Sequence, residues 1–490
     1  MFDEKILERR ETPVITTCGS GYAAKALLLV LGLCMIGLIS AAPAVAQQDE
    51  ADQNAPQPET APAQEEEDVY AGQAASAYNP ETAVFGPLPR YRTEDGNFNI
   101  GVGTLLQLDA GTYSQNAQGG PATTQALQPD LEPGIKARRG ILLVSALLYQ
   151  DFIFFGAHDF FDTGDVAQDG LRSALVAYRG LDPLWFLVGQ QTISPPLDAS
   201  TFSSRRMFME EAMSSGAFGF APGTPSLGVS SLYRTKHNYV RLGLHSVPAK
   251  EIGGDSEGYG LHGRATWAPI AERTEALHFG VAGYWRKPTV TRGEAGGRER
   301  FNARSELRID DTSFVDTGSI KRVDSYYYGA LELLGVYGSF AFQAEYQRLE
   351  IERYNGPHDT AFRDLSFNGY YVQGSYYLTG ESPNYYSRFA TLWRVQPFNE
   401  FDLETGGWGA FEVAARFSHI DLDDGVNDLV HGGIRGGTAN NITLGLNWYP
   451  TALVRLSLNY VHSDIDNLSN TGLSEGEVID GIGFRMQWEF

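Results

Sequence analysis

The last ten residues of the chain alternate strictly between apolar and polar side chains. Apolar residues occupy every second position from Ile482 to Phe490, and Arg485, Gln487 and Glu489 lie between them. A period of two places the apolar set on one face of a β-strand and the polar set on the other. A soluble sandwich could end on such a strand. A terminal aromatic downstream of a secretory leader favours the closing strand of an outer-membrane barrel, with Trp488 and Phe490 as assembly determinants.

Residues 1–46 are predicted to be that leader, a signal peptide. Lys25 precedes an apolar run over residues 26–39, and the small residues ending at Ala46 fit a signal-peptidase site before Gln47. The run is too short for a comfortable transmembrane helix. Both cysteines, Cys18 and Cys34, lie in this segment, so the mature chain has no disulfide framework. The bulky residue before Cys34 argues against a lipoprotein.

Residues 47–94 have a different composition, rich in Pro, Ala, Gln and acidic residues. Such a stretch cannot bury enough apolar surface to offset its ordering entropy. We expect a disordered extension on the periplasmic side. It is either an inert spacer or a contact for peptidoglycan or a partner.

From residue 97 onward the period-two pattern recurs sixteen times. The predicted strands are residues 98–108, 141–148, 152–160, 171–178, 184–188, 227–233, 239–245, 259–267, 277–285, 325–337, 340–346, 367–378, 408–420, 442–448, 454–462 and 481–490. A weaker candidate, residues 303–309, is assigned to a loop. An even number is expected when both ends of the barrel face the same side. The fold predicted for residues 95–490 is therefore all-β: a transmembrane antiparallel β-barrel of about sixteen strands.

The connections between these strands differ in length. Tight turns at residues 149–151, 236–237 and 336–339 alternate with long polar loops at 115–133, 287–319, 379–407 and 421–438. Long loops at one end and tight turns at the other are typical of an outer-membrane barrel. A sandwich or propeller would need repeating blades or loops of even length, and the sequence has neither.

The alternation also predicts which residues face lipid. Phe411, Val413 and Phe417 should face lipid, with Glu412 and Arg416 facing the lumen. The same alternation recurs over residues 441–448. Because a Lys or Arg on the lipid side at mid-bilayer costs about 2–4 kcal/mol, the assignment is physically constrained. Sixteen strands enclose an aqueous channel, and we expect a wet lumen lined with Asn, Thr, Glu and Arg.

At this width, selectivity must come from a constriction and the charges near it. Residues 194–223 form the longest stretch without strand character in the first half, and Pro195 and Pro196 cannot join a central ladder. We expect this stretch to fold into the barrel, with residues 207–209 packing on the wall; an ordinary surface loop is the alternative. The constriction would carry Arg205 and Arg206 beside the permeation path, opposed by Glu210 and Glu211.

Several ordered motifs resemble those of the phosphate-selective porins O and P. The motifs are Val188-Gly189-Gln190-Gln191, Pro195-Pro196-Leu197, Ser203-Ser204-Arg205, Phe208-Met209-Glu210, Gly263-Arg264-Ala265-Thr266-Trp267, Phe314-Val315-Asp316-Thr317-Gly318, Gly369-Tyr370-Tyr371-Val372-Gln373 and Asn441-Ile442-Thr443-Leu444-Gly445. The resemblance spans roughly residues 98–490. It implies a trimeric outer-membrane porin that conducts anions, phosphate or polyphosphate, and whose third loop enters the lumen.

The family's phosphate selectivity is attributed to a ladder of arginines with a few lysines at the constriction. This sequence departs from that pattern, because no lysine lies in residues 194–223. Lumen-facing candidates for an arginine path are Arg138, Arg172, Arg241, Arg264, Arg286, Arg416 and Arg485. Pairing with a lumen carboxylate is the alternative role for each. Arg suits an oxyanion path because it stays charged and presents a planar fork of donors.

Charge and motifs give less support to other functions. The net charge of −23 argues against nucleic acid as a partner but does not set ion preference, since loops can hold the acids. We expect no cofactor, no metal and no catalytic site, since the sequence has neither a His-Glu-x-x-His motif nor a P-loop. His158 beside Asp159 and His419 near Asp421 are interpreted as interface or lumen residues. A general or cation-leaning porin is the main alternative, ahead of a barrel enzyme or a structural anchor.

Overall fold

The computed structural model describes residues 90–117, 131–161, 170–193, 195–219, 225–246, 258–290, 293–356, 361–466 and 476–490. The predicted signal peptide and nearly all of the predicted acidic extension lie outside these residues. No helix among the described residues is long and apolar enough to cross a membrane.

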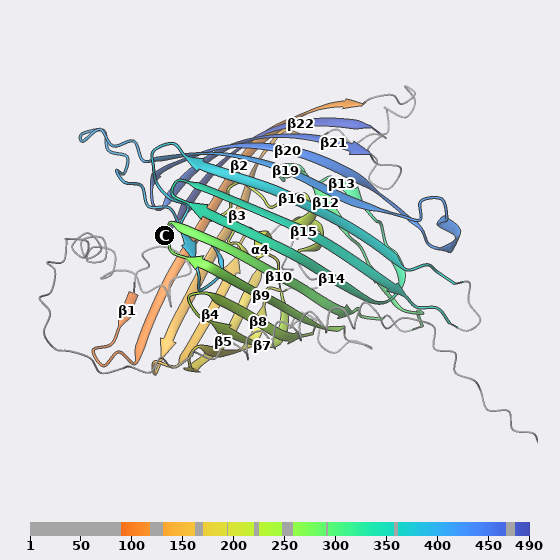
Figure 1. Cartoon of the computed structure of the whole chain (residues 1–490), viewed down its shortest axis with the longest axis horizontal. Helices are drawn as coiled ribbons and strands as arrows, with labels where there is room; N and C mark the ends of the chain where they lie inside the picture. Colours follow the sequence, from red (N-terminus) through yellow and green to blue (C-terminus); the bar gives the residue numbers. More distant parts are fainter. Residues whose placement is uncertain are drawn as a thin grey trace, which may run out of the picture. The chain divides into compact units, whose positions relative to one another are not determined.

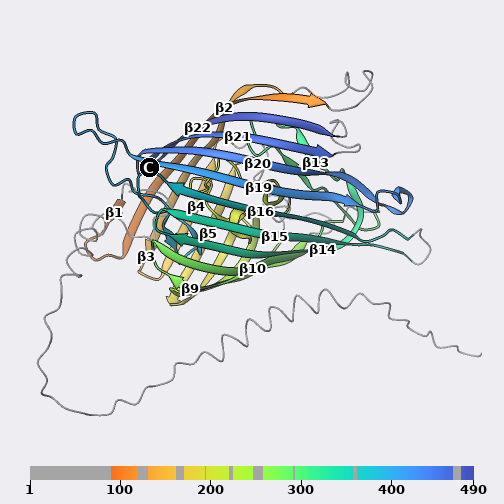
Figure 2. The same ribbon diagram turned by 45° about the horizontal axis from the view of Figure 1, so that its top comes forward.

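Sixteen long antiparallel strands of the described chain form one closed barrel (Figures 1 and 2). They are β2 (Phe98–Ala117), β3 (Gly134–Leu148), β4 (Phe152–Asp159), β5 (Leu171–Leu181), β6 (Leu184–Gln191), β7 (Ser226–Arg234), β8 (Asn238–His245), β9 (Tyr259–Ala271), β10 (Glu275–Lys287), β14 (Ile320–Tyr337), β15 (Phe340–Arg353), β16 (Leu365–Tyr377), β19 (Ala410–Asp424), β20 (Ile434–Thr451), β21 (Val454–Asp466) and β22 (Glu477–Glu489). The predicted fold class and strand number are confirmed.

Closure depends on the first and last barrel strands. β2 pairs with β3 on one side and with β22 on the other, where Leu105 lies opposite Glu489. Two short strands extend the sheet: β1 (Arg90–Arg92) pairs with β2, and β11 (Gly297–Glu299) pairs with β14. The weak candidate at residues 303–309 lies in a loop, as predicted. There β12 (Asn302–Arg304) pairs with β13 (Ser313–Asp316) in a separate two-stranded sheet.

The predicted alternation of side chains is confirmed. On β20, Leu444 is 49% exposed on the outer face, whereas Thr443 is 0% exposed on the inner face. On β22, Trp488 is 48% exposed and Arg485 is 0% exposed. Aromatic rings gather near the turn end of the outer face, where Trp488 stacks on Phe490. This arrangement matches an apolar band bounded by an interfacial aromatic girdle.

The connections at one end of the barrel are short, with one exception. Six of them span residues 149–151, 182–183, 235–237, 272–274, 338–339 and 452–453. Short turns mark the periplasmic end of such barrels, and β1 and the C-terminus lie at this end (Figure 1). The seventh connection, residues 378–409, also lies here, because it follows β16 and precedes β19. The prediction that this segment is one of the long loops at the opposite end of the barrel was wrong.

Three segments of the described chain pack inside the barrel. The constriction segment, described at residues 192–193, 195–219 and 225, carries α4 (Leu197–Ser200) and α5 (Met213–Phe218). The fifth loop, described at residues 288–290 and 293–319, carries β12 and β13. The periplasmic segment, residues 378–409, carries β17 (Tyr385–Tyr386) and β18 (Thr391–Leu392). A short 3-10 helix, η2 (Leu429–His431), lies in an outer loop.

The inner space is less wet than predicted. Phe218 of α5 and Phe301 of the fifth loop form a buried cluster with the wall residues Tyr284 and Tyr326. The prediction failed because the inward segments bring apolar side chains of their own to the wall. Inward positions on β6 and β8 are partly exposed, however, among them Leu187, Gly189, Arg241 and Gly243. The remaining solvent-accessible space therefore reaches this part of the wall.

Candidate constriction site

The constriction segment enters the barrel, as predicted, and hydrogen bonds hold its first turn. The backbone N–H groups of Leu197 and Asp198 donate to the two carboxylate oxygens of Glu345 on β15, at 2.8 and 2.9 Å. The Tyr371 hydroxyl donates to the same carboxylate at 2.7 Å. The Asp198 carboxylate in turn accepts from the backbone N–H of Ala212 at 2.8 Å. Burial raises the pKa of Asp198, although Arg206 and Arg416 oppose this.

Residues 207–209 pack on the barrel wall, as predicted. Met207, Phe208 and Met209 are all buried. A Cβ atom on Gly445 of β20 would lie 3.2 Å from the Phe208 ring, so the missing side chain lets the ring approach the wall. The guanidinium of Arg416 lies 4.5 Å from the centroid of that ring. An aromatic face with a cation over it adds to the stabilisation from burial.

Glu210 accepts hydrogen bonds from three buried arginines of the wall. Arg138 and Arg139 of β3 lie 3.0 and 3.1 Å from its carboxylate, and Arg485 of β22 lies at 2.5 Å. Arg485 also pairs with Asp109 of β2 at 2.7 Å. Burial by itself would raise the pKa of Glu210, but the three guanidinium groups outweigh it and hold this pKa well below its usual range. Glu210 thus connects the constriction segment to β3 and β22, the two strands that flank β2.

Glu211 links the constriction segment to the fifth loop. Arg206 donates to its carboxylate at 2.5 Å, and Arg308 of the fifth loop donates at 2.7 Å. Burial opposes ionisation here too, but these two arginines lower the pKa of Glu211 to about 2. The predicted opposition of Arg206 and Glu211 is therefore present as a direct ion pair.

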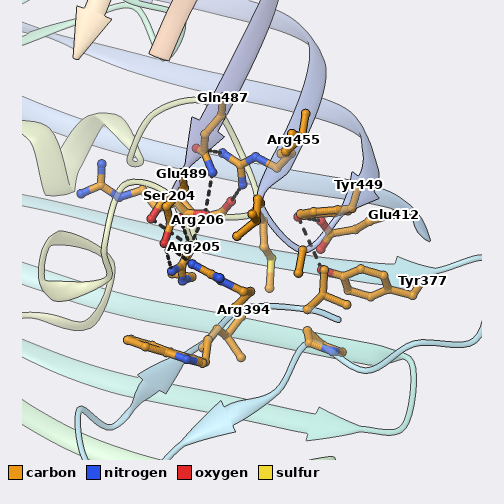
Figure 3. Close-up of a pocket in the computed structure, with 18 residues that line it drawn as sticks. Ser204, Arg205, Arg206, Tyr377, Arg394, Glu412, Tyr449, Arg455, Gln487 and Glu489 are labelled. Atoms are coloured by element: carbon orange, nitrogen blue, oxygen red, sulfur yellow. Dashed lines mark hydrogen bonds and ion pairs between the residues drawn. The ribbon is translucent and has the colours of Figure 1, made fainter. Parts of the chain in front are cut away.

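Arg205 does not oppose Glu210 or Glu211. It makes a two-pronged ion pair with Glu489 of β22, which also accepts from Arg394 of the periplasmic segment (Figure 3). The Arg205 guanidinium lies 5.2 Å from the centroid of the Trp393 ring. Glu489 lies on the polar face of the last strand, as the alternation predicts, but its two partners come from segments whose positions sequence periodicity does not give. This carboxylate joins both inward segments to the last strand.

A small cavity of about 20 Å³ lies between the constriction and periplasmic segments (Figure 3). Four arginines line it, Arg205, Arg206, Arg394 and Arg455, together with Glu412 and Glu489. Arg455 of β21 donates to the backbone oxygen of Arg206 at 2.6 Å and to the amide oxygen of Gln487 at 3.2 Å. A cavity of this size accommodates one or two waters.

The seven arginines predicted to line an anion path have three kinds of surroundings. Five pair with carboxylates, at distances of 2.5 to 3.0 Å: Arg138 with Glu210, Arg172 with Asp159, Arg264 with Glu332, Arg416 with Glu306, and Arg485 with Asp109 and Glu210. Arg241 donates to the amide oxygen of Gln191 at 2.6 Å. Arg286 is buried, and its Nε and Nη1 have no partner among the described residues.

Several participants were not predicted. Arg139 and Arg455 occupy inward positions of their strands, so the period-two pattern could have included them. Arg138 joins Arg139 on the inner side because the register between β2 and β3 shifts after Gln107. The remaining ones, Arg308, Arg394 and Glu306, lie in loops that periodicity does not describe.

The histidine pairs noted in the sequence have ordinary partners. Asp159 beside His158 accepts from Arg172 at 2.7 Å, and Nδ1 of His419 lies 2.8 Å from the side-chain oxygen of Asn440. Within the described ranges, no group of three or more His, Cys, Asp or Glu side chains could hold a metal ion.

Comparison with known proteins gives the family. The model of the family "Phosphate-selective porin O and P" matches residues 128–490. The chain belongs to this family. Porin O of Pseudomonas aeruginosa is 27% identical, over 81% of this chain and 90% of its own length. An uncharacterised protein of Caulobacter vibrioides is 29% identical, over 65% of this chain and 62% of its own length.

Solved structures with a similar chain trace include other outer-membrane channels. The anion-selective porin from Comamonas acidovorans is 13% identical, with a TM-score of 0.46 over 80% of this chain and 100% of that one. The channel DcaP of Acinetobacter baumannii is 13% identical, with a TM-score of 0.45 over 82% and 100%. Family membership, together with the closed barrel, makes this chain a porin of the bacterial outer membrane.

Proposed function

We propose that this porin conducts small hydrophilic anions, with phosphate or polyphosphate as the preferred solute. The observation that carries the proposal is the excess of arginine in the constriction network. Nine arginines lie there with eight carboxylates: Arg138, Arg139, Arg205, Arg206, Arg308, Arg394, Arg416, Arg455 and Arg485, against Asp109, Asp198, Glu210, Glu211, Glu306, Glu345, Glu412 and Glu489.

Arginine is suited to this role for two reasons. Its guanidinium stays charged at any physiological pH, and its planar fork can bind an oxyanion through two hydrogen bonds at once. In a narrow, poorly hydrated passage such charges act more strongly than in open water. The proposal therefore does not require the lysines that the family pattern has at the constriction.

A cation-leaning porin is the second candidate, because the extracellular rim is acidic. Asp421, Asp423 and Asp424 lie at the end of β19, and Asp466 lies at the end of β21, on the other side of β20. Charges at a pore mouth concentrate counter-ions and can favour cations. Rim charges act across water and salt, which screen them, whereas the constriction charges lie in a poorly hydrated part of the barrel where screening is weaker. We therefore favour the anion path.

Phosphate titrated against chloride current in planar bilayers tests the proposal. We expect micromolar to millimolar phosphate to reduce the chloride current. Phosphate would stay bound to the arginines of the path for longer than chloride does, and so would block the passage of chloride. The replacement Arg455→Gln should weaken this block, and Arg348→Gln should not, since Arg348 is an exposed residue paired with Glu350. Chloride current that ignores phosphate would show a nonselective pore.

We further propose that the porin works as a homotrimer embedded in membrane lipid. The support is the family to which the chain belongs, not a contact seen in the single chain. The protein purified in mild detergent should have about three times the chain mass, and boiling in SDS should reduce it to the monomer. A single-chain mass in mild detergent would contradict the trimer.

A further inference from the structure

A second group of basic side chains lies on the wall away from the constriction network. We call it the lateral patch: Gln191 of β6, Arg241 and His245 of β8, His262 of β9 and Arg286 of β10. All five occupy inward positions on consecutive or neighbouring strands, where Gly243 lies opposite His262 and Gly260 lies opposite both His245 and Arg286. Arg241 and the nearby Gly243 are partly exposed, so the remaining inner space reaches the patch.

The two histidines of the patch contact each other. Their Nδ1 atoms are 3.4 Å apart, and their ring centroids are 5.5 Å apart. Arg241 lies within electrostatic range of His262, and Arg286 lies within range of His245. Gln191 accepts from Arg241 at 2.6 Å and from Ser230 at 2.9 Å, which orients the guanidinium. The patch is a connected row of four basic groups.

Glycines in the neighbouring strands make room for both imidazole rings. A Cβ atom on Gly243 would lie 2.4 Å from Cε1 of His262, and one on Gly260 would lie 2.8 Å from Nε2 of His245. Contacts this short are forbidden, so any larger residue at either position would displace a ring. The backbone is thus shaped around the histidine pair.

Several polar atoms of the patch are buried without a partner. Among the described residues, nothing bonds to Nε2 of either histidine, to Nε of Arg241, or to Nε and Nη1 of Arg286. Leaving a buried donor or acceptor unpaired destabilises the folded protein. The titratable groups that face the patch are Tyr284, Tyr326, Glu299 and Arg264, which lies opposite Arg241. Arg264 is already paired with Glu332 at 2.9 Å, which leaves Glu299 as the carboxylate near Arg286. An oxyanion in the adjoining inner space could supply the acceptors that these donors lack.

We propose that the lateral patch binds one tetrahedral oxyanion and that the histidine pair takes up one proton as the anion binds. The proposal rests on the proposed anion-conducting function and adds a site and a proton requirement to it. Arg241 and Arg286 supply fixed charge on either side of the histidines, and the two Nε2 atoms supply further donors.

The proton requirement follows from the contact between the two rings. A neutral imidazole has one N–H and one lone pair. If the two Nδ1 atoms share a hydrogen bond, the ring that donates there has a lone pair at Nε2. That lone pair repels an anion. Both Nε2 atoms can donate only after the pair takes up one more proton, so anion binding and proton binding strengthen each other.

Any test must distinguish the effect of Glu299 on the pH dependence of anion binding from that of the histidines. Burial raises the pKa of Glu299 to about 7, with Arg286 opposing the rise. Its protonation on acidification would release Arg286 and also favour an anion. The variant Glu299→Gln removes this contribution and should leave the dependence on the histidines intact.

The test is the block of chloride current by sulfate at several values between about pH 5 and pH 8. Sulfate is the probe because it remains a dianion over this range, whereas phosphate itself titrates near neutrality. For the Glu299→Gln protein we expect the block to strengthen as the pH falls, by up to about tenfold per pH unit, since one proton accompanies each anion. When His245→Gln and His262→Gln are added to this protein, the sulfate block should change by less than about twofold between pH 5 and pH 8.

The control is His462→Gln, a histidine on the outer face paired with Asp480, which should keep the full pH dependence. Each variant is first compared with the parent for trimer content and for chloride conductance near pH 8, which shows that it has folded. A sulfate block that does not change with pH, or that changes equally without the two histidines, would overturn the inference. Loss of anion selectivity in the parent would instead contradict the proposed function.

Discussion

At the scale of single residues, the constriction depends on carboxylates that each hold more than one arginine. Glu210 is 0% exposed and bonded to Arg138, Arg139 and Arg485, so its charge compensates guanidinium groups that water does not reach. Buried ion pairs add little net stability, but removing one partner leaves an uncompensated charge. The acids of the constriction therefore fix the arginines in place and limit the net positive charge.

The replacement Glu210→Gln tests this role. We expect a loss of about 3–5 kcal/mol in the free energy of unfolding, because three buried cations lose their shared carboxylate. Urea unfolding of the folded porin in detergent micelles measures it. The control Glu350→Gln removes an exposed partner of Arg348 and should cost at most about 1 kcal/mol. Equal stability of the two variants would show that the Glu210 network does not anchor the segment.

Acid should weaken the same anchoring through Glu211. Its pKa falls from 4.5 to about 2 on folding. Because the folded value is the lower one, the ionised carboxylate stabilises the fold at pH above about 4.5, and this contribution disappears as the pH falls towards 2. Thermal unfolding followed from pH 7 to pH 2 should show a smaller decline for Glu211→Gln than for the parent. The slope will not vanish, since Glu210 also titrates in acid. Identical profiles would contradict the ion pairs of Glu211.

Sequence periodicity predicts some residues of this network better than others. Arg416 and Arg485 were placed on the lumen side by simple alternation, and both are there. Their pairing with Glu306 and Glu210 was not predicted, although Glu210 was placed at the constriction, because both acids lie in inward segments whose path depends on tertiary packing. Arg138 faces inward together with Arg139 because of a register shift, and a bulge has no signal in an alternating pattern.

At the scale of elements, the periplasmic segment is the main departure from expectation. Loop length alone placed it among the long outer loops. Counting strands gives the right end: it follows the twelfth strand of a barrel that starts in the periplasm, so it must return there. Arg264 of β9 donates to two backbone oxygens of the periplasmic segment, those of Phe389 and Ala390, at 3.1 and 2.9 Å. Its rings Phe389 and Trp393 contact Phe202 of the constriction segment.

Shortening the periplasmic segment should therefore widen the pore. Replacing residues 380–407 with a two-residue turn removes the aromatic contacts and Arg394, but leaves Arg264 paired with Glu332. We expect a larger single-channel conductance and faster solute flux. Shortening the outer loop at residues 425–433 by a similar replacement is the control and should change conductance little. Unchanged conductance after removal of the periplasmic segment would show that it does not narrow the path.

At the scale of the whole molecule, the alternation of outer and inner side chains is what allows the chain to be a pore. The outer face bears Leu, Phe, Trp and Tyr, while arginines and carboxylates lie inside. This much follows from the sequence, because a period of two is a property of every strand. How far the interior is filled does not follow from the sequence, because it depends on three segments folding inward.

A charge placed on the outer face tests the membrane-facing surface. Leu444→Arg on β20 should lower the free energy of unfolding in a bilayer by about 2–4 kcal/mol, because a guanidinium would meet hydrocarbon. Leu429→Arg makes the same replacement at a half-exposed residue of an outer loop and should be close to neutral. Urea unfolding from lipid vesicles compares them. Equal effects would mean that residue 444 does not face lipid.

The central claim is that the inner charges of this barrel select anions, and the reversal potential under a KCl gradient across a planar bilayer tests it most directly. The purified full-length porin should give a potential whose sign shows that chloride permeates more readily than potassium. A potential of the opposite sign, with potassium more permeant, would contradict the account and leave a porin governed by its acidic rim.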